Sequence, residues 1–468
     1  MEQSQKWPGF TRTCYYLIII GAEALGKKKG YRVQYNWEFS PQYYDQSLEI
    51  LEKSLNQVPA YKSWQNFDPG LGYSVDARYA AMPVLTKANI REHFPDGLVP
   101  VGLDIQRALD SGEITAVKTS GSSDVSVTNI WNQEWWNASE RASWKLNSYA
   151  SRIATGNHPE AILANARNVG FISDDVDLPT EKRRISRFLF LNEKTNPAKW
   201  SSELMDRMIG ELGIFKPAVL EANPSLLAKL SRYAADNKKR LFQPGLIVYT
   251  YEYPTQLHYR QIRQVFKGQM ASSYGSTETG YVFMQCEAGK FHQNSECCRV
   301  DFQPLKPEHG GPFVGRILVT TFNNPWYYML RFDVKDLVRI DKEGKCSCGR
   351  NSGFILSAIE GRTISMTLTC EGRLVTLREL DEAMSVLNGI DEYQLEQVSG
   401  KAYDLHLVSK RQDKNRLTGE VSGILKKLYG KEAKISVIYE DALSPEDSGK
   451  YSYAKALFPI NLEDYLDK

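Results

Sequence analysis

Two patterns of apolar residues recur along most of the chain. Within 224–235, apolar residues return at helical spacing and share one face: Leu226, Leu227, Leu230, Tyr233 and Ala234. Short apolar runs at 246–251 and 315–322 are typical of buried strands. Helices that alternate with short apolar strands predict an α/β body.

The last hundred residues follow a different pattern. Tyr403, Leu405 and Leu407 alternate with polar residues, as in a half-exposed strand, and 435–439 is another strand candidate. Between them, apolar residues recur at helical spacing: Leu417, Val421, Ile424, Leu425 and Leu428. This predicts a small α+β unit. We place the junction near Gly361, which divides the chain into a large domain, 1–361, and a small domain, 362–468.

Composition narrows the class of protein. The 468 residues include 58 basic and 56 acidic side chains, and a net charge of +2 argues against a partner that is a nucleic acid. The apolar run at 15–24 contains Glu23 and is too short to span a bilayer, so we expect no membrane insertion. Seven scattered cysteines do not form a secreted disulfide framework, which predicts a cytoplasmic protein. A homodimer is the commonest state if the chain is not a monomer.

Two polar segments could carry chemistry. A hydroxyl-rich loop follows the apolar residues 114–117 and could bind a phosphate through backbone N–H groups and hydroxyls: Thr119, Ser120, Gly121, Ser122 and Ser123. The second segment, 272–280, could place an aromatic ring on a heterocycle, with Thr277 donating to a phosphate and Glu278 binding Mg²⁺. On composition alone, either segment could equally be an ordinary polar loop.

The second segment resembles a family motif. Tyr274 to Glu278 resembles the Tyr-Gly-x-Thr-Glu motif of the adenylate-forming enzymes, the superfamily of acyl-CoA synthetases, adenylation domains and luciferases. The resemblance covers most of 40–455. It implies an α/β body with a mobile α+β C-terminal domain, and an enzyme that uses ATP and Mg²⁺. It also implies that ATP or AMP is bound by the hydroxyl-rich loop and by these further residues: Ser273, Tyr274, Gly275, Ser276, Thr277, Asp336, Arg350 and Arg362.

Further segments follow in the family's order. Asp336 in 331–337 is similar to the acid that accepts the ribose hydroxyls, and a carboxylate suits two vicinal hydroxyls. Gly361-Arg362-Thr363 resembles the interdomain hinge. Lys450, in Ser448-Gly449-Lys450, resembles the lysine that reaches the reacting carboxylate and the α-phosphate. The resemblance therefore implies Lys450, Glu278 and Thr277 as the catalytic residues.

A cysteine-containing segment suggests a branch of this superfamily. Cys346-Ser-Cys348-Gly-Arg350 is similar to the phenylacetate-CoA ligase branch, which includes coenzyme F390 synthetase-like and capsule-biosynthesis proteins. Together with Cys286 and His292, these cysteines offer three thiolates and one imidazole, the ligand set of a structural zinc site. The spacing alone is equally compatible with buried or free thiols. Cys297 and Cys298 could substitute for a ligand.

The implied reaction is attack of a carboxylate on the α-phosphate of ATP. No catalytic base is required, because the carboxylate is already a nucleophile and the enzyme has only to position two anions and neutralise charge. Transfer to a thiol such as CoA would follow rotation of the small domain. The abundance of Tyr and Trp favours an aromatic acid.

Several departures from the family pattern leave alternatives open. Asp124 replaces a glycine of the phosphate loop, a cation near the triphosphate is missing, and Ile364 and Ser365 follow the hinge in place of an acid. The glycine-rich loop that lines the pantetheine tunnel is also reduced. The chain could therefore be a CoA ligase, an adenylating enzyme that uses an amine, a hydroxyl or a carrier protein as acceptor, or a non-catalytic nucleotide-binding protein.

Other aromatic and histidine residues carry weaker signals. Four tryptophans and a tyrosine could line an aromatic pocket, although their helical spacing is more typical of a core: Trp131, Trp135, Trp136, Trp144 and Tyr149. Tyr249 and Tyr251 are further pocket candidates. The remaining histidines are expected on the surface or satisfied in the core: His93, His158, His258, His309 and His406.

Overall fold

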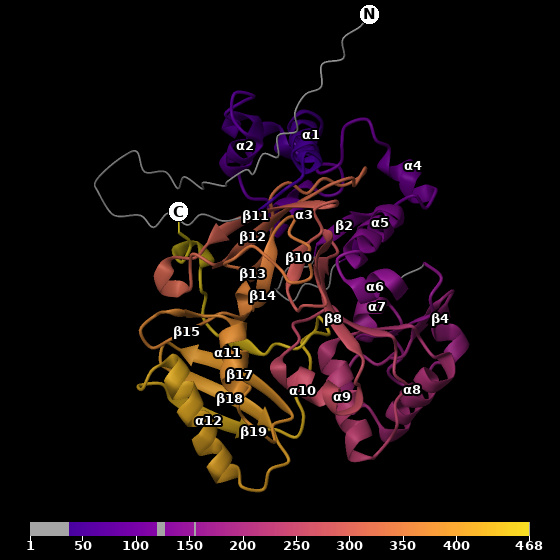
Figure 1. Cartoon of the computed structure of the whole chain (residues 1–468), viewed down its shortest axis with the longest axis vertical. Coiled ribbons are helices and arrows are strands. Elements are labelled where there is room, and N and C mark those ends of the chain that lie inside the picture. The colour runs from indigo at the N-terminus through magenta and orange to yellow at the C-terminus, as the bar shows by residue number, and fades with distance from the viewer. Residues whose placement is uncertain (1–36, 119–126, 154–155, 468) are drawn as a thin grey trace, which may run out of the picture.

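A twelve-stranded sheet is the central element of the computed structural model, which describes residues 37–118, 127–153 and 156–467 (Figure 1). Its strand order is β11-β12-β13-β14-β10-β9-β8-β7-β6-β3-β5-β4. The parallel half contains β3 Glu160–Leu163, β5 Phe188–Phe190, β6 Val219–Ala222, β7 Leu246–Tyr249 and β8 Gln269–Ser276, with β4 Arg184–Ile185 antiparallel at the edge. The antiparallel half contains β9 Gly280–Gln285, β10 Phe291–Gln293, β11 Cys298–Pro304, β12 Val314–Thr321, β13 Phe332–Ile340 and β14 Ile355–Arg362. Strand β8 joins the halves, because it pairs with β7 in parallel and with β9 antiparallel.

Helices cover both faces of the parallel half. On one face, α8 Ser202–Phe215, α9 Pro224–Asp236 and α10 Gln256–Val265 bury Leu220, Ile247 and Tyr249. On the other face, α5 Gln133–Trp144 and α6 Ser148–Ile153 pack on Val219 and Val248. Because successive strand residues point to opposite faces, Glu221 lies on the α5 side with Val219. The short helix α7 Ala166–Val169 follows β3.

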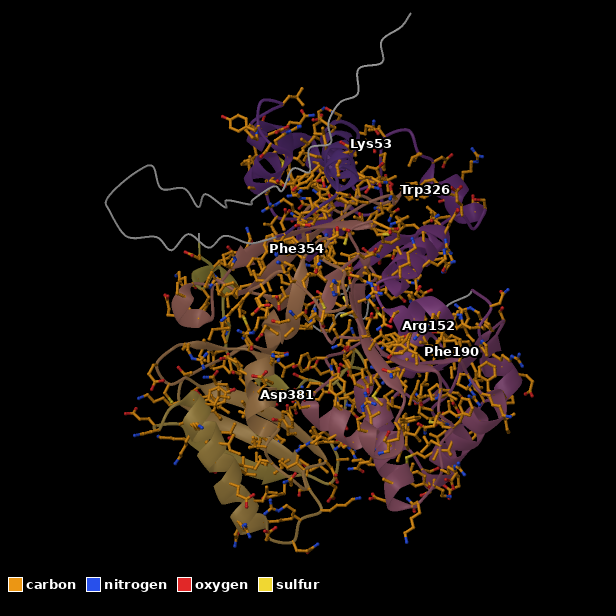
Figure 2. The ribbon with its side chains drawn as sticks, in the orientation of Figure 1. Lys53, Arg152, Phe190, Trp326, Phe354 and Asp381 are labelled. Atoms are coloured by element: carbon orange, nitrogen blue, oxygen red, sulfur yellow. The ribbon has the colours of Figure 1, made fainter. Side chains whose placement is uncertain are left out.

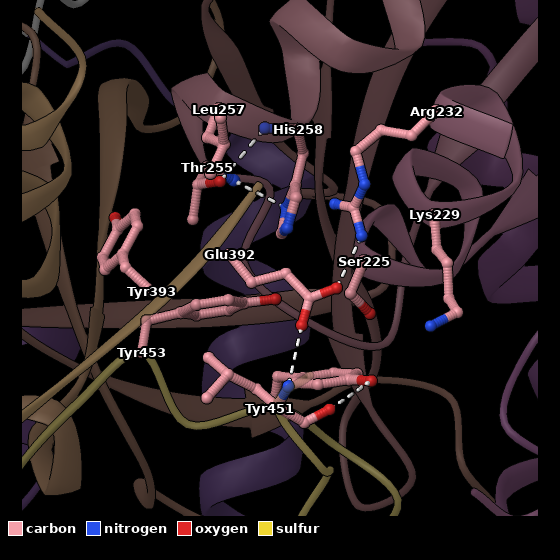
Figure 3. Close-up of a pocket in the computed structure, with 11 residues that line it drawn as sticks. Ser225, Lys229, Arg232, Thr255, Leu257, His258, Glu392, Tyr393, Tyr451 and Tyr453 are labelled. Atoms are coloured by element: carbon pink, nitrogen blue, oxygen red, sulfur yellow. Dashed lines mark hydrogen bonds and ion pairs between the residues drawn. The ribbon is translucent and has the colours of Figure 1, made fainter. Parts of the chain in front are cut away.

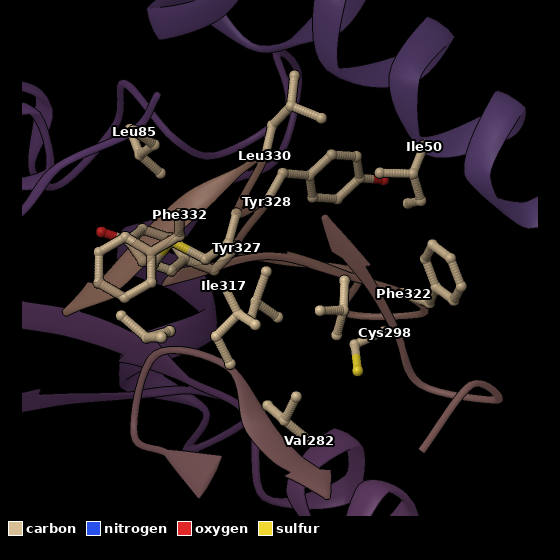
Figure 4. Packing of buried hydrophobic residues seen from close by; sticks show 14 of the residues in the cluster. Ile50, Leu85, Val282, Cys298, Ile317, Phe322, Tyr327, Tyr328, Leu330 and Phe332 are labelled. Carbon is tan, nitrogen blue, oxygen red and sulfur yellow. The ribbon is translucent and has the colours of Figure 1, made fainter. Parts of the chain in front are cut away.

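The antiparallel half packs against the N-terminal helices. These are α1 Pro41–Gln57, α2 Val75–Ala81, α3 Lys87–His93 and α4 Ile105–Asp110, followed by the hairpin β1 Thr115–Lys118 and β2 Thr128–Trp131. Figure 4 shows the core here, where Ile50 of α1 and Leu85 approach Tyr328, Leu330 and Phe332. Phe354 and Trp326, labelled in Figure 2, belong to the same core.

A second sheet forms a smaller unit, coloured orange to yellow in Figure 1, next to α10. Its strand order is β19-β18-β17-β20. The unit contains β15 Thr367–Leu368, β16 Leu374–Val375, α11 Leu377–Met384, β17 Glu392–Ser399, β18 Ala402–Val408, α12 Lys414–Tyr429, β19 Lys434–Tyr439 and β20 Ala454–Ala456. Leu417, Val421 and Leu425 of α12 are buried against Leu405 and Leu407 of β18, as their spacing predicted.

The end of the chain returns from the small unit to the large sheet. Lys306 donates its backbone N–H to the Tyr465 carbonyl at 2.9 Å, and Asp467 donates to the Pro304 carbonyl at 2.9 Å. One apolar cluster contains side chains from the body, the segment after β14 and this tail: Leu305, Val314, Leu337, Met366, Leu374, Leu462 and Leu466. The chain enters the small unit after β14 and returns to the large sheet in this tail, so both connections between the two units pass through one small region.

The sequence predicted the α/β fold and most elements correctly. The helix expected at 224–235 is α9, and the strand expected at 315–322 is β12. The strand expected at 246–251 ends at Tyr249, because Tyr251 adopts a φ of 72°, outside the extended region. No helix within the described ranges is both long and apolar enough to cross a bilayer, and the apolar run 15–24 lies outside those ranges.

Some of the aromatic and histidine candidates are buried, and the others are partly exposed. Trp135 and Trp144 are buried, whereas Trp131 and Trp136 are half-buried. Among the histidines, His158 contacts Glu160 at 3.2 Å, and Nδ1 of His258 accepts the Thr255 N–H.

Candidate active site

The β8–β9 hairpin lies where the two halves of the sheet meet. It contains the predicted nucleotide-binding residues Ser273, Tyr274, Gly275, Ser276 and Thr277 and the predicted magnesium ligand Glu278. A Cβ at Gly275 would lie 2.2 Å from the carbonyl oxygen of Gly280, so only glycine fits in this narrow hairpin. Ser276 Oγ closes the turn by accepting the N–H of Thr279 at 3.3 Å. Packing and turn geometry therefore fix the position of Glu278.

Asp336 on β13 contacts two of the other predicted residues. The Tyr274 hydroxyl donates to Asp336 Oδ2 at 2.7 Å, and Arg362 Nε lies 3.7 Å from Oδ1. Burial raises the pKa of Asp336, while Arg362 and Tyr274 oppose the rise. The hairpin, β13 and the end of β14 thus converge on one carboxylate.

Lys450 reaches the same place from the small unit. Burial lowers the pKa of Lys450 and Arg362 adds to the lowering, while the carboxylates of Glu252, Asp336 and Glu278 oppose it. The ammonium group is therefore within electrostatic range of the hairpin glutamate and the β13 aspartate, although the three are far apart in sequence. The fold thus brings together three residues from separate motifs.

Glu252, which the sequence analysis missed, holds the segment that carries Lys450. Its Oε1 accepts the Ser225 N–H at 2.9 Å, and its Oε2 accepts the Tyr451 N–H at 3.4 Å. Arg167 of α7 donates to the Asp447 carbonyl at 2.7 Å on the other side of the lysine. Two contacts with the body thus flank Lys450.

Lys87, the first residue of α3, is a second residue that the sequence analysis missed. Its Nζ lies 3.3 Å from Glu278 Oε1, and the Glu278 side chain is 5% exposed. Glu278 Oε1 is buried and accepts no well-directed hydrogen bond from the described part of the chain. The sequence offered no cation for a triphosphate, and the structure places Lys87 beside the predicted magnesium ligand.

Arg350, a predicted nucleotide-binding residue, does not join this group. The hydroxyl-rich loop, Thr119 to Ser123, and Asp124 lie outside the described residues. Arg350 pairs with Glu287 at 3.1 Å, and its side chain also hydrogen-bonds Cys348. Arg350 therefore lies at the cysteine cluster and does not contact Asp336, which pairs with Arg362 instead.

Cys286, His292, Cys346 and Cys348 form a compact group at one end of β9, β10 and β14. Their ligand atoms all lie within 4.8 Å of one another. The Cys286 and Cys346 sulfurs are 3.6 Å apart, and Cys348 Sγ is 3.3 Å from His292 Nε2. These distances suit the tetrahedral coordination of zinc. Burial raises the pKa of Cys286 to about 12, and a bound cation would lower it. Cys297 and Cys298 are not part of the group.

The small unit packs tightly on α9 and α10 in this arrangement. Arg232 Nη2 lies 2.5 Å from Glu392 Oε1, and Asp381, labelled in Figure 2, accepts the N–H of Gln256 at 2.9 Å. Figure 3 shows the small cavity between the units, about 20 Å³, which is room for one water. It is lined by Ser225, Lys229, Arg232, Thr255, Leu257, His258, Glu392, Tyr393, Leu443, Tyr451 and Tyr453.

Comparisons with known proteins identify the fold. No protein-family model matches the chain, and no curated protein matches it. Among solved structures, it is similar to 2-hydroxyisobutyryl-CoA ligase in the postadenylation state in complex with R3-HIB-AMP, with a TM-score of 0.66, 16% identity and coverage of 89% of this chain and 88% of that chain.

Other states of the same ligase are less similar. Its open conformation, with 2-HIB-AMP and CoA, gives a TM-score of 0.54 at 16% identity over 89% of this chain and 91% of that chain. Its thioesterification state gives 0.52 at 17% identity over 89% of each chain. Our chain therefore has the fold of this adenylate-forming CoA ligase, with its two units arranged more nearly as in the postadenylation state.

Proposed function

We propose that this protein is an AMP-forming ligase that activates a carboxylic acid with ATP as an acyl-adenylate. The observation that carries the proposal is the convergence of Lys450, Asp336 and Glu278 from the small unit, β13 and the hairpin. A protein without this chemistry has no physical need to gather a lysine, an arginine and three carboxylates at the junction of two units. Fold similarity agrees with the proposal but does not fix the reaction.

Each residue has a role that follows from its position. Asp336 would accept the ribose hydroxyls through Oδ1 and Oδ2, with Tyr274 beside the base. Lys450 would neutralise the negative charge that develops as the substrate carboxylate meets the α-phosphate. Thr277, next to Glu278 in the hairpin turn, would donate its hydroxyl to a phosphate oxygen. Since the carboxylate is the nucleophile, orientation and charge neutralisation supply the rate enhancement.

Glu278 fits a magnesium ion bound with the nucleotide. Its buried Oε1 lacks a well-directed hydrogen bond, and a hard cation prefers such a carboxylate oxygen. When bound, Mg²⁺ would neutralise part of the phosphate charge. Lys87, at 3.3 Å from Glu278, would add a cation for the leaving pyrophosphate, and the hydroxyl-rich loop at 119–123 would complete this side.

We propose that the acyl group then passes to a thiol such as CoA, as in the phenylacetate-CoA ligase branch, with an aromatic acid as substrate. The small domain, 362–468, would rotate relative to 1–361. Such a rotation would break the Arg232–Glu392 ion pair and the contact between Asp381 and Gln256. The two connections between the units pass through one apolar cluster, which supports a pivot there.

We also propose that Cys286, His292, Cys346 and Cys348 bind a structural zinc ion. Four protein ligands would leave no open position for catalysis. The ion would fasten the 346–348 loop to β9 and β10 and stabilise the antiparallel half of the sheet.

Pyrophosphate release tests the proposed function directly. Purified protein is incubated with ATP, Mg²⁺ and a panel of aryl, fatty and amino acids, with and without CoA. We expect acid-dependent pyrophosphate release, and a thioester only when CoA is present. Release without thioester formation would favour an amine, a hydroxyl or a carrier protein as acceptor. Nucleotide binding without release for any acid would refute the proposal and favour a non-catalytic nucleotide-binding protein.

A further inference from the structure

Three glutamates and two tyrosines form a polar cluster on the α5 side of the parallel strands. The members come from separate elements: Glu140 of α5, Glu160 of β3, Glu221 of β6, Tyr251 after β7 and Tyr281 of β9. Each tyrosine interacts electrostatically with all three carboxylates. The adenylation chemistry proposed above uses none of these side chains.

The cluster carries more negative than positive charge. Glu160 is paired, since Arg187 Nη1 lies 2.7 Å and His158 Nε2 3.2 Å from its Oε2. Glu140 has the Tyr281 hydroxyl at 3.1 Å. Arg187 is the main cation that acts on Glu140 and Glu221, but its guanidinium group already forms an ion pair with Glu160.

Glu221 is the least compensated of the three carboxylates. Burial raises the pKa of Glu221 to about 8, and repulsion by Glu160 and Glu140 adds to the rise. A hydrogen bond from the Tyr251 hydroxyl opposes it. A cation beside Glu221 would restore an ordinary carboxylate pKa, so the cluster is electrostatically suited to a positively charged group.

Aromatic rings adjoin these carboxylates. The Trp136 ring lies 4.9 Å from the Tyr281 ring, and Trp131 lies 4.2 Å from Trp136. Trp136 and Tyr281 are both partly exposed. Aromatic faces and carboxylates together are the chemistry that recognises an organic ammonium group.

Unpartnered polar groups on the same face indicate a ligand independently of charge. Asn223 is 1% exposed, and neither atom of its side-chain amide has a hydrogen-bond partner within the described residues. Asn223 extends the pairing of β6 by donating its N–H to the Leu163 carbonyl at 2.9 Å, and it stands two residues after Glu221. Its side chain therefore points to the Glu221 side. Ser273 Oγ, on β8, is also buried without a partner in the described chain.

The expected ligand is an organic cation rather than a metal ion. Within the described ranges, the one group of three or more His, Cys, Asp or Glu residues compact enough for a metal is the Cys286–Cys348 cluster. The three glutamates do not form such a group in the described chain, whereas an ammonium group with its carbon skeleton could contact several of them. Tyr281 is the second residue of β9, directly after the turn that carries Glu278. The cluster therefore adjoins the proposed reaction centre.

We propose that this cluster binds the protonated amine of the acid substrate, so that the enzyme activates an amino acid in the broad sense, a carboxylic acid that also carries an alkylammonium group. This inference rests on the proposed adenylation function. Glu221 and Glu140 provide the countercharge, Trp136 and Tyr281 pack on the carbon chain, and Asn223 and Ser273 accept N–H groups.

The test compares acids that differ only in the amine. Acid-dependent pyrophosphate exchange is measured for phenylalanine against 3-phenylpropanoate, β-alanine against propanoate, and 6-aminohexanoate against hexanoate. Since a site that pairs with a polar group rejects an analogue lacking it, the preferred amino acid should exceed its counterpart by at least about 100-fold in kcat/KM. Equal or better exchange with the acids that lack the amine would overturn the inference and leave the adenylation function intact.

A substitution at Glu221 and a direct measurement of acid binding complete the test. Glu221→Gln should lower kcat/KM for the amino acid by about 10-fold or more and leave the KM for ATP unchanged, whereas Glu134→Gln, on an exposed site of α5, should change neither. Calorimetric titration with both members of each pair measures binding without turnover. If no acid supports exchange, the proposed adenylation function fails. Equal affinity for the amino acid and for its counterpart without the amine in this titration would overturn the inference about the cluster.

Discussion

Glu221→Gln should make the protein more stable at alkaline pH. Burial raises the pKa of Glu221 from its usual 4.5 to about 8, so the folded state favours the protonated carboxyl. The contribution to stability is therefore complete below pH 4.5 and is lost as the pH rises through 8. Glutamine keeps the shape of the protonated side chain and cannot ionise, so the variant should not show this loss.

The structure gives the size of the effect. The difference between 4.5 and 8 corresponds to a ceiling of about 5 kcal/mol, at about 1.4 kcal/mol per pH unit. The Glu221 side chain keeps partial exposure, so water reduces the cost of its charge, and we expect about 2 kcal/mol at pH 9. At pH 5 the two proteins should differ much less than at pH 9, because only the first part of the interval between 4.5 and 8 has then been crossed.

Urea unfolding of the wild type and of Glu221→Gln at pH 5, 7 and 9 measures this difference. Other groups titrate over this range in both proteins, so the comparison isolates the one carboxyl. Parallel pH profiles would refute the reasoning, because they would mean that Glu221 is ionised and stabilised without a ligand. Greater stability together with loss of amino-acid activation is the pattern of a residue retained for binding rather than for folding.

Three further substitutions test the site and the metal centre. Lys450→Ala should slow adenylation by about 100- to 1000-fold with little change in nucleotide affinity, measured by single-turnover kinetics and titration, because the lysine acts mainly in the transition state. Lys87→Met should lower kcat/KM for ATP by about 10-fold in pyrophosphate release, since it removes a cation at the magnesium ligand. Elemental analysis should find one zinc per chain, and Cys348→Ser should lower both the zinc content and the Tm.

Control variants accompany these tests, and each test has a result that would contradict the proposed role. Lys53→Met, on α1 and 42% exposed at its side chain, controls for loss of a lysine, and Cys370→Ser controls for loss of a thiol. Equal loss of nucleotide binding and rate would contradict the role of Lys450. An unchanged ATP dependence would contradict that of Lys87. A fully folded, zinc-free preparation would contradict the metal site.

Residues in short contiguous motifs could be predicted from the sequence. Tyr274 and Glu278 belong to one hairpin whose glycine and hydroxyl residues determine its shape locally. Asp336 and Lys450 could be singled out because each stands in a recognisable segment, and the structure places both near the hairpin. What could not be predicted is that Arg350 pairs with Glu287, because that contact depends on how the 346–350 loop folds onto the start of α6 and the end of β9.

Residues that act through tertiary contacts gave no local signal. Lys87 begins an ordinary helix capped by Thr86, and only packing of that helix against the hairpin brings its ammonium to Glu278. Glu221 interrupts an apolar strand, which periodicity analysis treats as a minor defect. Its importance appears only when Glu140, Glu160 and the two tyrosines are seen to surround it. Charge excess within a cluster is a property of the fold, not of any one segment.

Glu252 connects the two proposed parts of the active site. It directly follows Tyr251, whose hydroxyl bonds Glu221, and it accepts the N–H of Tyr451, which directly follows Lys450. Tyr251 has a φ of 72°, so the backbone turns sharply between the amine cluster and this contact. An acid whose ammonium group displaces the Tyr251 hydroxyl from Glu221 would alter the same short segment that holds the Lys450 segment against the body. Recognition of the substrate amine and placement of the catalytic lysine would then share one structural element. Acids that lack the amine would therefore bind more weakly and would also be poorly oriented toward Lys450.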